Sequence, residues 1–130
     1  MSALLLDTHT FLWWALADTR LPERVRGQIA GASNGVYVSA ATAWEIRTKS
    51  RLGKLPEVNP SWVLRLGEVL AVEEFQPLPI TFEDGDRAGA FTAAHKDPFD
   101  RMLAAQALNQ RLALVSNDAA LDAFGIVRIW

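Results

Sequence analysis

The sequence predicts an α/β fold in which helices cover both faces of a mostly parallel sheet. Short apolar segments alternate with longer helical segments along the whole chain, the pattern of parallel strands joined by helices. The first apolar segment, residues 3–6, has no polar position, as expected of a strand covered on both faces. Half of the 130 residues are hydrophobic, enough for one buried core, so we expect a single domain over residues 1–130.

The first half of the chain is expected to supply two strands and four helices. In order, these are a strand at 3–6, helices at 8–17 and 22–31, a strand at 36–38, and helices at 39–53 and 59–72. Ser39 and the pair Asn59-Pro60 suit helix starts, because a short polar side chain caps the first turn and proline fits the first helical position. Gly31 and Gly53 stand where helices are expected to end.

The second half of the chain continues the alternation. In order, we expect a strand at 75–80, helices at 81–94 and 97–110, a strand at 112–116, a helical turn at 118–125 and a strand at 126–130. Two prolines restrict the strand at 75–80 to an edge of the sheet, because proline donates no backbone hydrogen bond. Thr81 and Asp84 have the spacing of a capping box, and Asp97-Pro98 is a strong helix start.

Charge and cysteine content exclude several classes of protein. The 13 Lys and Arg residues nearly balance the 15 Asp and Glu residues, so no general positive field marks a nucleic-acid binder. The chain has no cysteine, which excludes disulfides and thiolate sites. The only apolar segment near the N-terminus is too short for a signal peptide or a membrane span, so we expect a cytoplasmic protein with no membrane partner.

Glycine patterns and acid spacings argue against other α/β enzymes. No GxGxxG follows the first strand and no GxxxxGK[ST] occurs, so dinucleotide binding and P-loop chemistry are not expected. A phosphatase of the haloacid-dehalogenase type needs a second Asp two residues after the first, where this chain has His9. A response-regulator receiver needs an acidic pair after its first strand and a lysine at a late strand end, and the sequence has neither.

Four acidic residues are expected at one edge of the sheet. Asp7 and Asp118 follow predicted strands, and Glu45 lies about two turns into the helix that follows another strand. Asp100 lies in the first turn of the helix at 97–110, at the top of an apolar stripe that faces the sheet. Because the carboxyl ends of parallel strands meet at one edge, all four side chains can converge there.

Each acid also has a simple structural explanation when it is taken alone. Asp7, Asp97 and Asp118 each suit the cap of a helix. We prefer the cap for Asp97, because proline follows it directly. Glu45 has Lys49 four residues further on, which is the spacing of an ordinary surface ion pair.

Taken together, the acids predict a metal site. Asp100 has no local cationic partner, because Arg101 points elsewhere on the helix, and an inward carboxylate is costly unless paired or bound to a cation. Oxygen ligands suit Mg²⁺ or Mn²⁺. One or two such ions would support hydrolysis of a phosphodiester, by activating water and stabilising the charge on the attacking and leaving oxygens.

Four segments resemble the acidic motifs of a known family. The segments LLLDTHTFLWW, VSAATAWEIRTKSRLGKL, HKDPFDRMLAAQA and LVSND are similar, in order and spacing, to those of PIN-domain nucleases, and most closely to the VapC-like toxins of bacterial toxin–antitoxin modules. The resemblance spans almost the whole chain. It implies an α/β/α sandwich around a parallel sheet, Mg²⁺- or Mn²⁺-dependent endoribonuclease activity on RNA, and neutralisation by a small cognate antitoxin.

The resemblance also implies roles for individual residues. The acids of the family fall on Asp7, Glu45, Asp100 and Asp118, and Ser116 replaces its usual small hydroxyl residue, Thr. Asp7 and Asp100 are expected to be the principal metal ligands, with Asp118 binding directly or through water. Glu45 would orient or deprotonate a water, or hold a second ion. Two alternatives stay open: a non-catalytic protein-binding module of the same fold, and a housekeeping nuclease outside any toxin–antitoxin pair.

Basic and aromatic residues near the acids also have more than one interpretation. Lys49 and Arg51 belong to a basic stretch that is either a solvated helix face or a contact for RNA phosphates. His9 and His95 lack the spacing of a zinc site; we prefer a structural role for His9, although its closeness to Asp7 in the sequence leaves open a supporting role beside that acid. We expect four tryptophans in the core: Trp13, Trp14, Trp44 and Trp62. A partly exposed tryptophan would suit the interface of a homodimer or the interface with an antitoxin, and a homodimer is the expected assembly.

Overall fold

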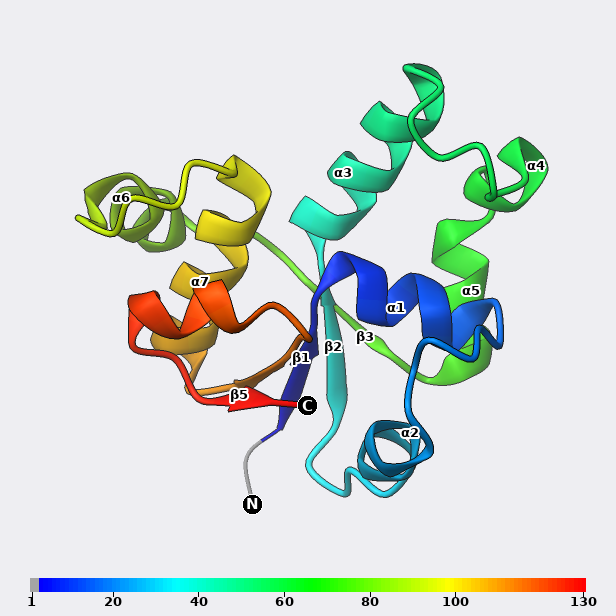
Figure 1. The fold of residues 1–130 in the computed structure, drawn as a ribbon, viewed down its shortest axis with the longest axis horizontal. Coiled ribbons are helices and arrows are strands. Elements are labelled where there is room, and N and C mark those ends of the chain that lie inside the picture. The colour runs from blue at the N-terminus through cyan, green and yellow to red at the C-terminus, as the bar shows by residue number, and fades with distance from the viewer. Residues whose placement is uncertain (1–2) are drawn as a thin grey trace.

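In the computed structural model, which describes residues 3–130, the strands form one sheet in which every pairing is parallel (Figure 1). The strands are β1 (Leu4–Leu6), β2 (Val36–Ser39), β3 (Gln76–Leu78), β4 (Ala113–Val115) and β5 (Arg128–Ile129). Their order in the sheet is β3-β2-β1-β4-β5. The prediction of a mostly parallel sheet is therefore confirmed, and the proline-containing β3 lies at an edge, as expected.

The order of the strands reverses beside β1. The chain runs from β1 to β2 and β3 on one side, and then crosses to place β4 and β5 on the other side. Because the strands are parallel, their carboxyl ends lie along one edge, and ligands of such sheets bind in the crevice where the order reverses. Asp7 follows β1 and Ser116 follows β4 at this point.

Helices cover both faces of the sheet. They are α1 (Thr8–Ala15), α2 (Glu23–Ala30), α3 (Ala40–Arg51), α4 (Pro60–Val63), α5 (Leu66–Glu73), α6 (Phe82–Ala90), α7 (Pro98–Gln110) and the 3-10 helix η1 (Ala119–Phe124). Figure 1 shows α6, α7 and η1 on one side of the sheet, α1, α2 and α5 on the other, and α3 rising from the carboxyl edge. The three-layer α/β/α sandwich is confirmed. Within residues 3–130, no helix has both the length and the apolar character needed to cross a membrane.

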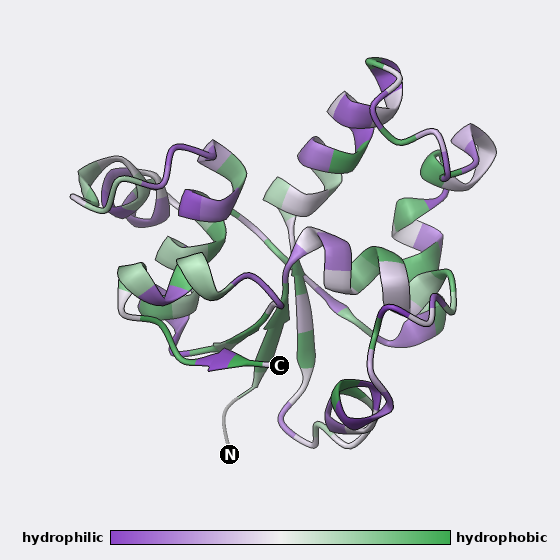
Figure 2. Ribbon diagram, in the orientation of Figure 1, coloured by the Kyte–Doolittle hydropathy of each residue, from purple (hydrophilic) through white to green (hydrophobic). Residues whose placement is uncertain are grey.

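The two faces of β1 belong to two separate layers of the core. Leu4 and Leu6 pack in the layer with Phe11 of α1, whereas Leu5 packs in the layer with Leu103 of α7. Burying one such side chain is worth ~1.5–3 kcal/mol, so β1 is fixed from both sides, together with the residue that follows it. Figure 2 shows the same distribution: β1 is hydrophobic, and hydrophilic residues gather on the outer part of α3.

Several helix starts follow the sequence prediction. The Ser39 hydroxyl accepts a hydrogen bond from the Ala41 amide, and the Asn59 side chain accepts one from the Ser61 amide. Thr81 and Asp84 form the expected reciprocal capping box. The local signals therefore define where these helices begin.

The helix predicted at 59–72 is interrupted. α4 ends at Val63 and α5 begins at Leu66, with Arg65 in a non-helical conformation between them. Val63 is buried, Leu64 is 69% exposed, and Leu66 again packs against the core. Neither glycine nor proline stands at the break, so tertiary packing rather than local sequence sets it.

The helix predicted at 81–94 ends earlier, at Ala90. Phe91 has an extended conformation, and the guanidinium of Arg101 in α7 donates hydrogen bonds to four backbone carbonyls of this region. These carbonyls accept hydrogen bonds from the Arg101 side chain instead of from the backbone amides of a further helical turn. The chain therefore leaves the helix and forms a loop over residues 91–97.

Candidate active site

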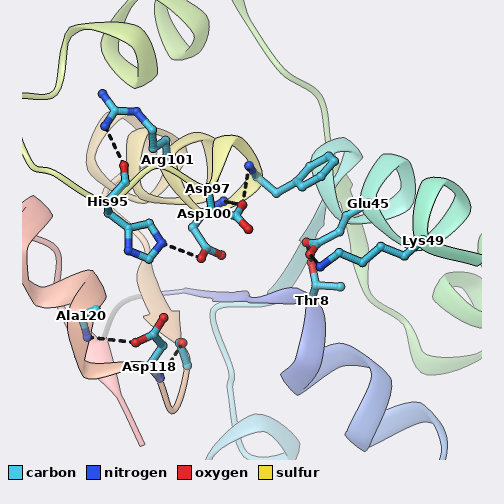
Figure 3. Close-up of polar contacts among 11 residues, drawn as sticks. Thr8, Glu45, Lys49, His95, Asp97, Asp100, Arg101, Asp118 and Ala120 are labelled. Carbon is cyan, nitrogen blue, oxygen red and sulfur yellow. Dashed lines mark hydrogen bonds and ion pairs between the residues drawn. The ribbon is translucent and has the colours of Figure 1, made fainter. Parts of the chain in front are cut away.

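A polar cavity of about 180 Å³ lies at the carboxyl edge of the sheet. The residues that line it are Asp7, Thr8, His9, Glu45, Lys49, Asp97, Asp100, Asn117 and Asp118. All four acids predicted from the sequence are among them, although they come from segments that are far apart in the chain. Figure 3 shows the side chains of Glu45, Asp97, Asp100 and Asp118 around this region.

Asp7 serves both as a helix cap and as a wall of the cavity. Its side chain accepts a hydrogen bond from the Thr10 amide at 2.8 Å and so caps α1. Burial raises the pKa of Asp7, while hydrogen bonds from Ser116 and Thr10 oppose this increase. The two interpretations of this acid are therefore compatible, and the fold holds a carboxylate where its charge is unfavourable.

Glu45 is buried, so the alternative of an ordinary surface ion pair is wrong for this residue. Only 5% of its side chain is exposed. Thr8 donates a hydrogen bond to Glu45 Oε1 at 2.6 Å, and Lys49 Nζ donates to Glu45 Oε2 (Figure 3). Burial alone would lower the pKa of Lys49, but the hydrogen bond and charge of Glu45, with the charges of Asp97 and Asp100, raise it. Lys49 therefore keeps its positive charge at the cavity.

Asp100 has a partner that the sequence did not reveal. His95 Nε2 lies 2.8 Å from Asp100 Oδ2 (Figure 3). Burial raises the pKa of Asp100, the hydrogen bond from His95 opposes the increase, and the charges of Asp97 and Glu45 add to it. The expectation that Asp100 lacks a local partner is therefore wrong. It rested on helical spacing alone, and His95 reaches Asp100 from the loop that precedes the helix.

Asp97 has the capping role predicted for it. Its Oδ1 accepts hydrogen bonds from the amides of Phe99 at 2.8 Å and Asp100 at 3.0 Å. The cap sets the first turn of α7 and thereby the position of Asp100. Asp97 also lines the cavity and adds a further negative charge to it.

Ser116 connects the two acids that follow β1 and β4. Its hydroxyl oxygen accepts a hydrogen bond from the Asp118 amide at 3.1 Å, and its side chain is hydrogen-bonded to Asp7. Asp118 in turn caps η1 by accepting from the Ala120 amide at 3.0 Å. Ser116 is fully buried, so the hydroxyl acts inside the protein and positions both acids.

Arg101 is a residue of this region whose role the sequence did not indicate. Its guanidinium donates to the carbonyls of Ala88, Phe91, Ala93 and His95, at distances between 2.7 and 3.1 Å. These bonds hold the loop that carries His95 against α7. Backbone carbonyls have no sequence signature, so no signal in the sequence could have identified these partners.

The remaining predicted residues lie around the cavity. Lys49 lines it, whereas Arg51 is exposed at the end of α3. His9 also lines the cavity, with its ring 5.7 Å from that of Trp13. The expectation of a core position is wrong for Trp44, which is 61% exposed and packs edge to face on Phe99. Trp13, Trp14 and Trp62 are partly buried against the core, as expected.

The donor groups of the cavity fit a divalent cation. Five carboxylates line it, those of Asp7, Glu45, Asp97, Asp100 and Asp118, against one lysine. Carboxylates held at partly buried positions favour a counter-ion or protonation: burial is the main cause of the raised pKa values of Asp7 and Asp100, and the charges of Asp97 and Glu45 add to the increase at Asp100. Ligand atoms of His95, Asp100 and Asp118 lie within 4.8 Å of one another. Asp7 and Glu45 lie outside that close group but line the same cavity.

Comparisons with known proteins agree with this architecture. A family model described as the PIN domain matches residues 4–127. None of the curated proteins matches the sequence. The fold is similar to that of DNA-bound VapBC from Salmonella typhimurium, with 20% identity, coverage of 100% of this chain and 98% of the other, and a TM-score of 0.72.

Two further structures show the same likeness. FitAcB from Neisseria gonorrhoeae has 22% identity, with coverage of 98% of this chain and 96% of the other and a TM-score of 0.71. VapBC2 from Rickettsia felis, bound to a promoter DNA fragment, has 10% identity, with coverage of 98% and 97% and a TM-score of 0.71. At such low identity, these likenesses concern the fold.

Proposed function

From the fact that the chain belongs to the PIN-domain family, whose members are nuclease-type hydrolases of phosphodiester bonds, we propose that it is an endoribonuclease dependent on Mg²⁺ or Mn²⁺. The observation that carries this proposal is the convergence of Asp7, Glu45, Asp100 and Asp118 on one cavity. RNA is proposed as the substrate on the resemblance of the sequence motifs to VapC-like toxins.

The proposed roles follow from how each carboxylate is held. Asp7 and Asp100 are the principal ligands of the ion, because burial makes their negative charge unfavourable without a cation. Asp118 binds the ion directly or through water. A divalent ion, when bound, supplies electrostatic stabilisation of the negative charge that develops on the phosphate and on the leaving oxygen.

Glu45 is proposed to act on the attacking water, or to hold a second ion. Thr8 and Lys49 each hold one of its two oxygens, so the orientation of the carboxylate is fixed. A carboxylate in this position can orient a water and accept its proton at one oxygen. Lys49 then stands beside the same atoms, where its charge would attract a phosphate.

We also propose that the protein is the toxin of a toxin–antitoxin pair. The proposal is supported by the sequence resemblance to VapC-like toxins and by the likeness of the fold to VapBC from Salmonella typhimurium and FitAcB from Neisseria gonorrhoeae. An apolar groove of about 300 Å³ gives a small antitoxin a place to dock an amphipathic helix. It lies between α3, α5 and the end of β3, and Ala43, Ile46, Leu66, Leu70 and Pro79 are among its lining residues.

The homodimer is likewise a proposal. A second apolar groove, of about 330 Å³, lies between α2 and the strands β1, β4 and β5, the last of which is an edge strand. Leu4, Ala32, Val127 and Ile129 line it, and Val127 is 67% exposed. An exposed apolar surface next to an open strand edge is the kind of surface that a second copy of the chain covers.

Cleavage of a labelled single-stranded RNA by the purified protein tests the proposed activity. We expect cleavage with Mg²⁺ or Mn²⁺ and none with EDTA. Asp7→Asn or Asp100→Asn should lower the rate about a thousandfold, because a loss of several kcal/mol of transition-state stabilisation corresponds to about three factors of ten. Asp86→Asn, an exposed acid on α6 outside the cavity, is the matched control and should cleave normally.

Two outcomes would overturn the proposal. One is cleavage by Asp7→Asn and Asp100→Asn at the rate of the unmodified chain. The other is the absence of any specific thermal stabilisation by Mn²⁺, which would favour a non-catalytic binding module. The same acid-to-amide variants provide the control for that titration, since they should lose the stabilisation.

A further inference from the structure

We propose that His95 is a direct ligand of the divalent ion and that its nitrogen makes the site select a first-row transition ion, with Mn²⁺ preferred over Mg²⁺. The inference rests on the proposed function, because it takes the acidic cavity to be a metal site. It goes further in adding a nitrogen donor to a set of carboxylates and in stating which ion that set prefers.

The first support is the separation of the donor atoms. His95 Nε2 and Asp100 Oδ2 are 2.8 Å apart. Neighbouring ligands of an octahedral ion with bonds of ~2.1 Å are themselves about 3 Å apart, and opposite ligands about 4.2 Å. The ligand atoms of His95, Asp100 and Asp118 all lie within 4.8 Å of one another. The spacing that serves the hydrogen bond therefore also serves two adjacent ligands of one ion.

The second support is the way the imidazole is held. The His95 carbonyl accepts a hydrogen bond from Arg101 Nη1 at 2.9 Å, and its ring packs on Phe124 with the ring centroids 5.7 Å apart. One contact fixes the backbone and the other fixes the plane of the ring. A ligand held in this way loses little conformational freedom when it binds an ion, which is how metal sites are pre-organised.

The third support is the chemistry of the donors. Mg²⁺ prefers oxygen ligands and keeps several bound waters, so it binds a nitrogen donor weakly. First-row transition ions accept imidazole together with carboxylates. In the metal-free protein the proton on Nε2 is donated to the Asp100 carboxylate; when that proton leaves and Nδ1 carries the ring proton instead, the lone pair on Nε2 is free to bind an ion. Replacing the hydrogen bond by a shared ion therefore keeps both side chains in place.

The chain carries its own control for the experiment. It has two histidines, and both stand near the acids. His9 lines the cavity and packs near Trp13, but the close group of ligand atoms found within residues 3–130 contains His95 and not His9. His9→Gln and His95→Gln are therefore matched variants. Glutamine at 95 retains a side-chain amide that can donate to Asp100, and it removes the imidazole nitrogen.

Electron spin echo envelope modulation of Mn²⁺ bound to the intact protein tests the inference. We expect modulation from a directly coordinated ¹⁴N nucleus in the unmodified chain and in His9→Gln, and its loss in His95→Gln. Labelling histidine with ¹⁵N in the His9→Gln variant should change the frequency of this modulation, and it identifies His95 without substituting it. Titration calorimetry should show the ratio of Mn²⁺ to Mg²⁺ affinity falling by about tenfold or more in His95→Gln.

The outcomes separate this inference from the proposed function. Mn²⁺ that binds through the carboxylates but shows no nitrogen coupling overturns the role of His95 and leaves the metal site intact. Nitrogen coupling that survives in His95→Gln and disappears in His9→Gln also overturns it. If Mn²⁺ does not bind the unmodified chain, and Asp100→Asn leaves the rate of RNA cleavage unchanged, the metal-dependent function itself is overturned.

Discussion

Thr8 and Glu45, from two different helices, are joined by a hydrogen bond of 2.6 Å between the Thr8 hydroxyl and Glu45 Oε1. Thr42 Oγ1 lies 3.2 Å from the Thr8 hydroxyl. Because the single hydroxyl proton of Thr8 is donated to Glu45, Thr42 must donate to Thr8. A buried chain of hydroxyls thus fixes the acid on α3 to the start of α1, directly after Asp7.

Replacing Thr8 by valine should release Glu45 while the shape of the side chain is kept. The carboxylate would lose a charge-assisted hydrogen bond inside the protein, so unfolding free energy should fall by ~1–3 kcal/mol. The rate of RNA cleavage should fall by up to about a hundredfold, the lower end of the contribution that a positioned general base makes. Thr8→Ser, which keeps the hydroxyl, is the control and should preserve the rate. Equal cleavage rates in both variants would show that this bond does not position Glu45.

Arg101→Lys should loosen the loop over residues 91–97. The guanidinium bonds four backbone carbonyls at once, and a lysine ammonium cannot reproduce that planar set of donors. We expect a loss of ~2–3 kcal/mol in unfolding free energy, measured by urea denaturation. Arg87→Lys, at an exposed position of α6, is the control and should change the free energy by less than about 0.5 kcal/mol. An equally small effect of Arg101→Lys would exclude this role.

The stability of the metal-free protein should rise as the pH falls from 7 toward 4. The pKa values of Asp7 and Asp100 are raised above the ordinary value of 3.8, chiefly by burial. The folded state therefore takes up protons at a higher pH than the unfolded state does. The stabilisation is fully present below pH 3.8 and is lost as the pH rises through the folded-state pKa values.

The double variant Asp7→Asn, Asp100→Asn isolates this effect. Asparagine caps a helix as well as aspartate does, so the variant should be more stable than the unmodified chain at pH 7 in EDTA. The difference should shrink as the pH falls toward 3.8. Two other acids change the stability at lower pH. Hydrogen bonds from Arg20 lower the pKa of Asp18 to about 2, and Arg128 lowers the pKa of Asp122. Both acids are present in the variant and in the unmodified chain, so they do not affect the difference between the two. A difference that stays constant between pH 7 and 4 would contradict the prediction.

The sequence sufficed to predict the sheet and the helices on both of its faces, because these depend on local signals. Neighbouring residues alone are enough to identify the apolar segments, helix caps such as Asp97, and the order of strands and helices. The four predicted acids line one cavity, and their catalytic roles stay predictions. The break at Arg65 and the early end of α6 could not be predicted, because tertiary contacts determine both. The same reason explains why Thr8, His95 and Arg101 were missed: each acts on an atom that only the folded chain brings close.

Lys49 and Arg51 are expected to differ in their effect on RNA binding, although they stand two residues apart. Lys49 is bonded to Glu45 at the cavity, whereas Arg51 is exposed at the end of α3. A cation that contacts a phosphate contributes about 0.7 to the slope of log affinity against log salt for single strands. If the exposed charge of Arg51 contacts an RNA phosphate, Arg51→Gln should reduce the magnitude of the slope of log RNA affinity against log salt concentration by about 0.7.

Lys49→Gln should act on the binding of the metal as well as on the binding of a phosphate at the cavity. Removing its charge takes away the one lysine that competes with a divalent ion for five carboxylates, so Mn²⁺ should bind several-fold more tightly. RNA binding can be measured by fluorescence anisotropy in the Asp100→Asn background. Mn²⁺ binding can be measured by calorimetry in the unmodified background. Arg24→Gln, at an exposed position of α2, is the control for both and should change neither quantity. Weaker Mn²⁺ binding in Lys49→Gln would show that Lys49 holds Glu45 in place for the ion rather than competing with it.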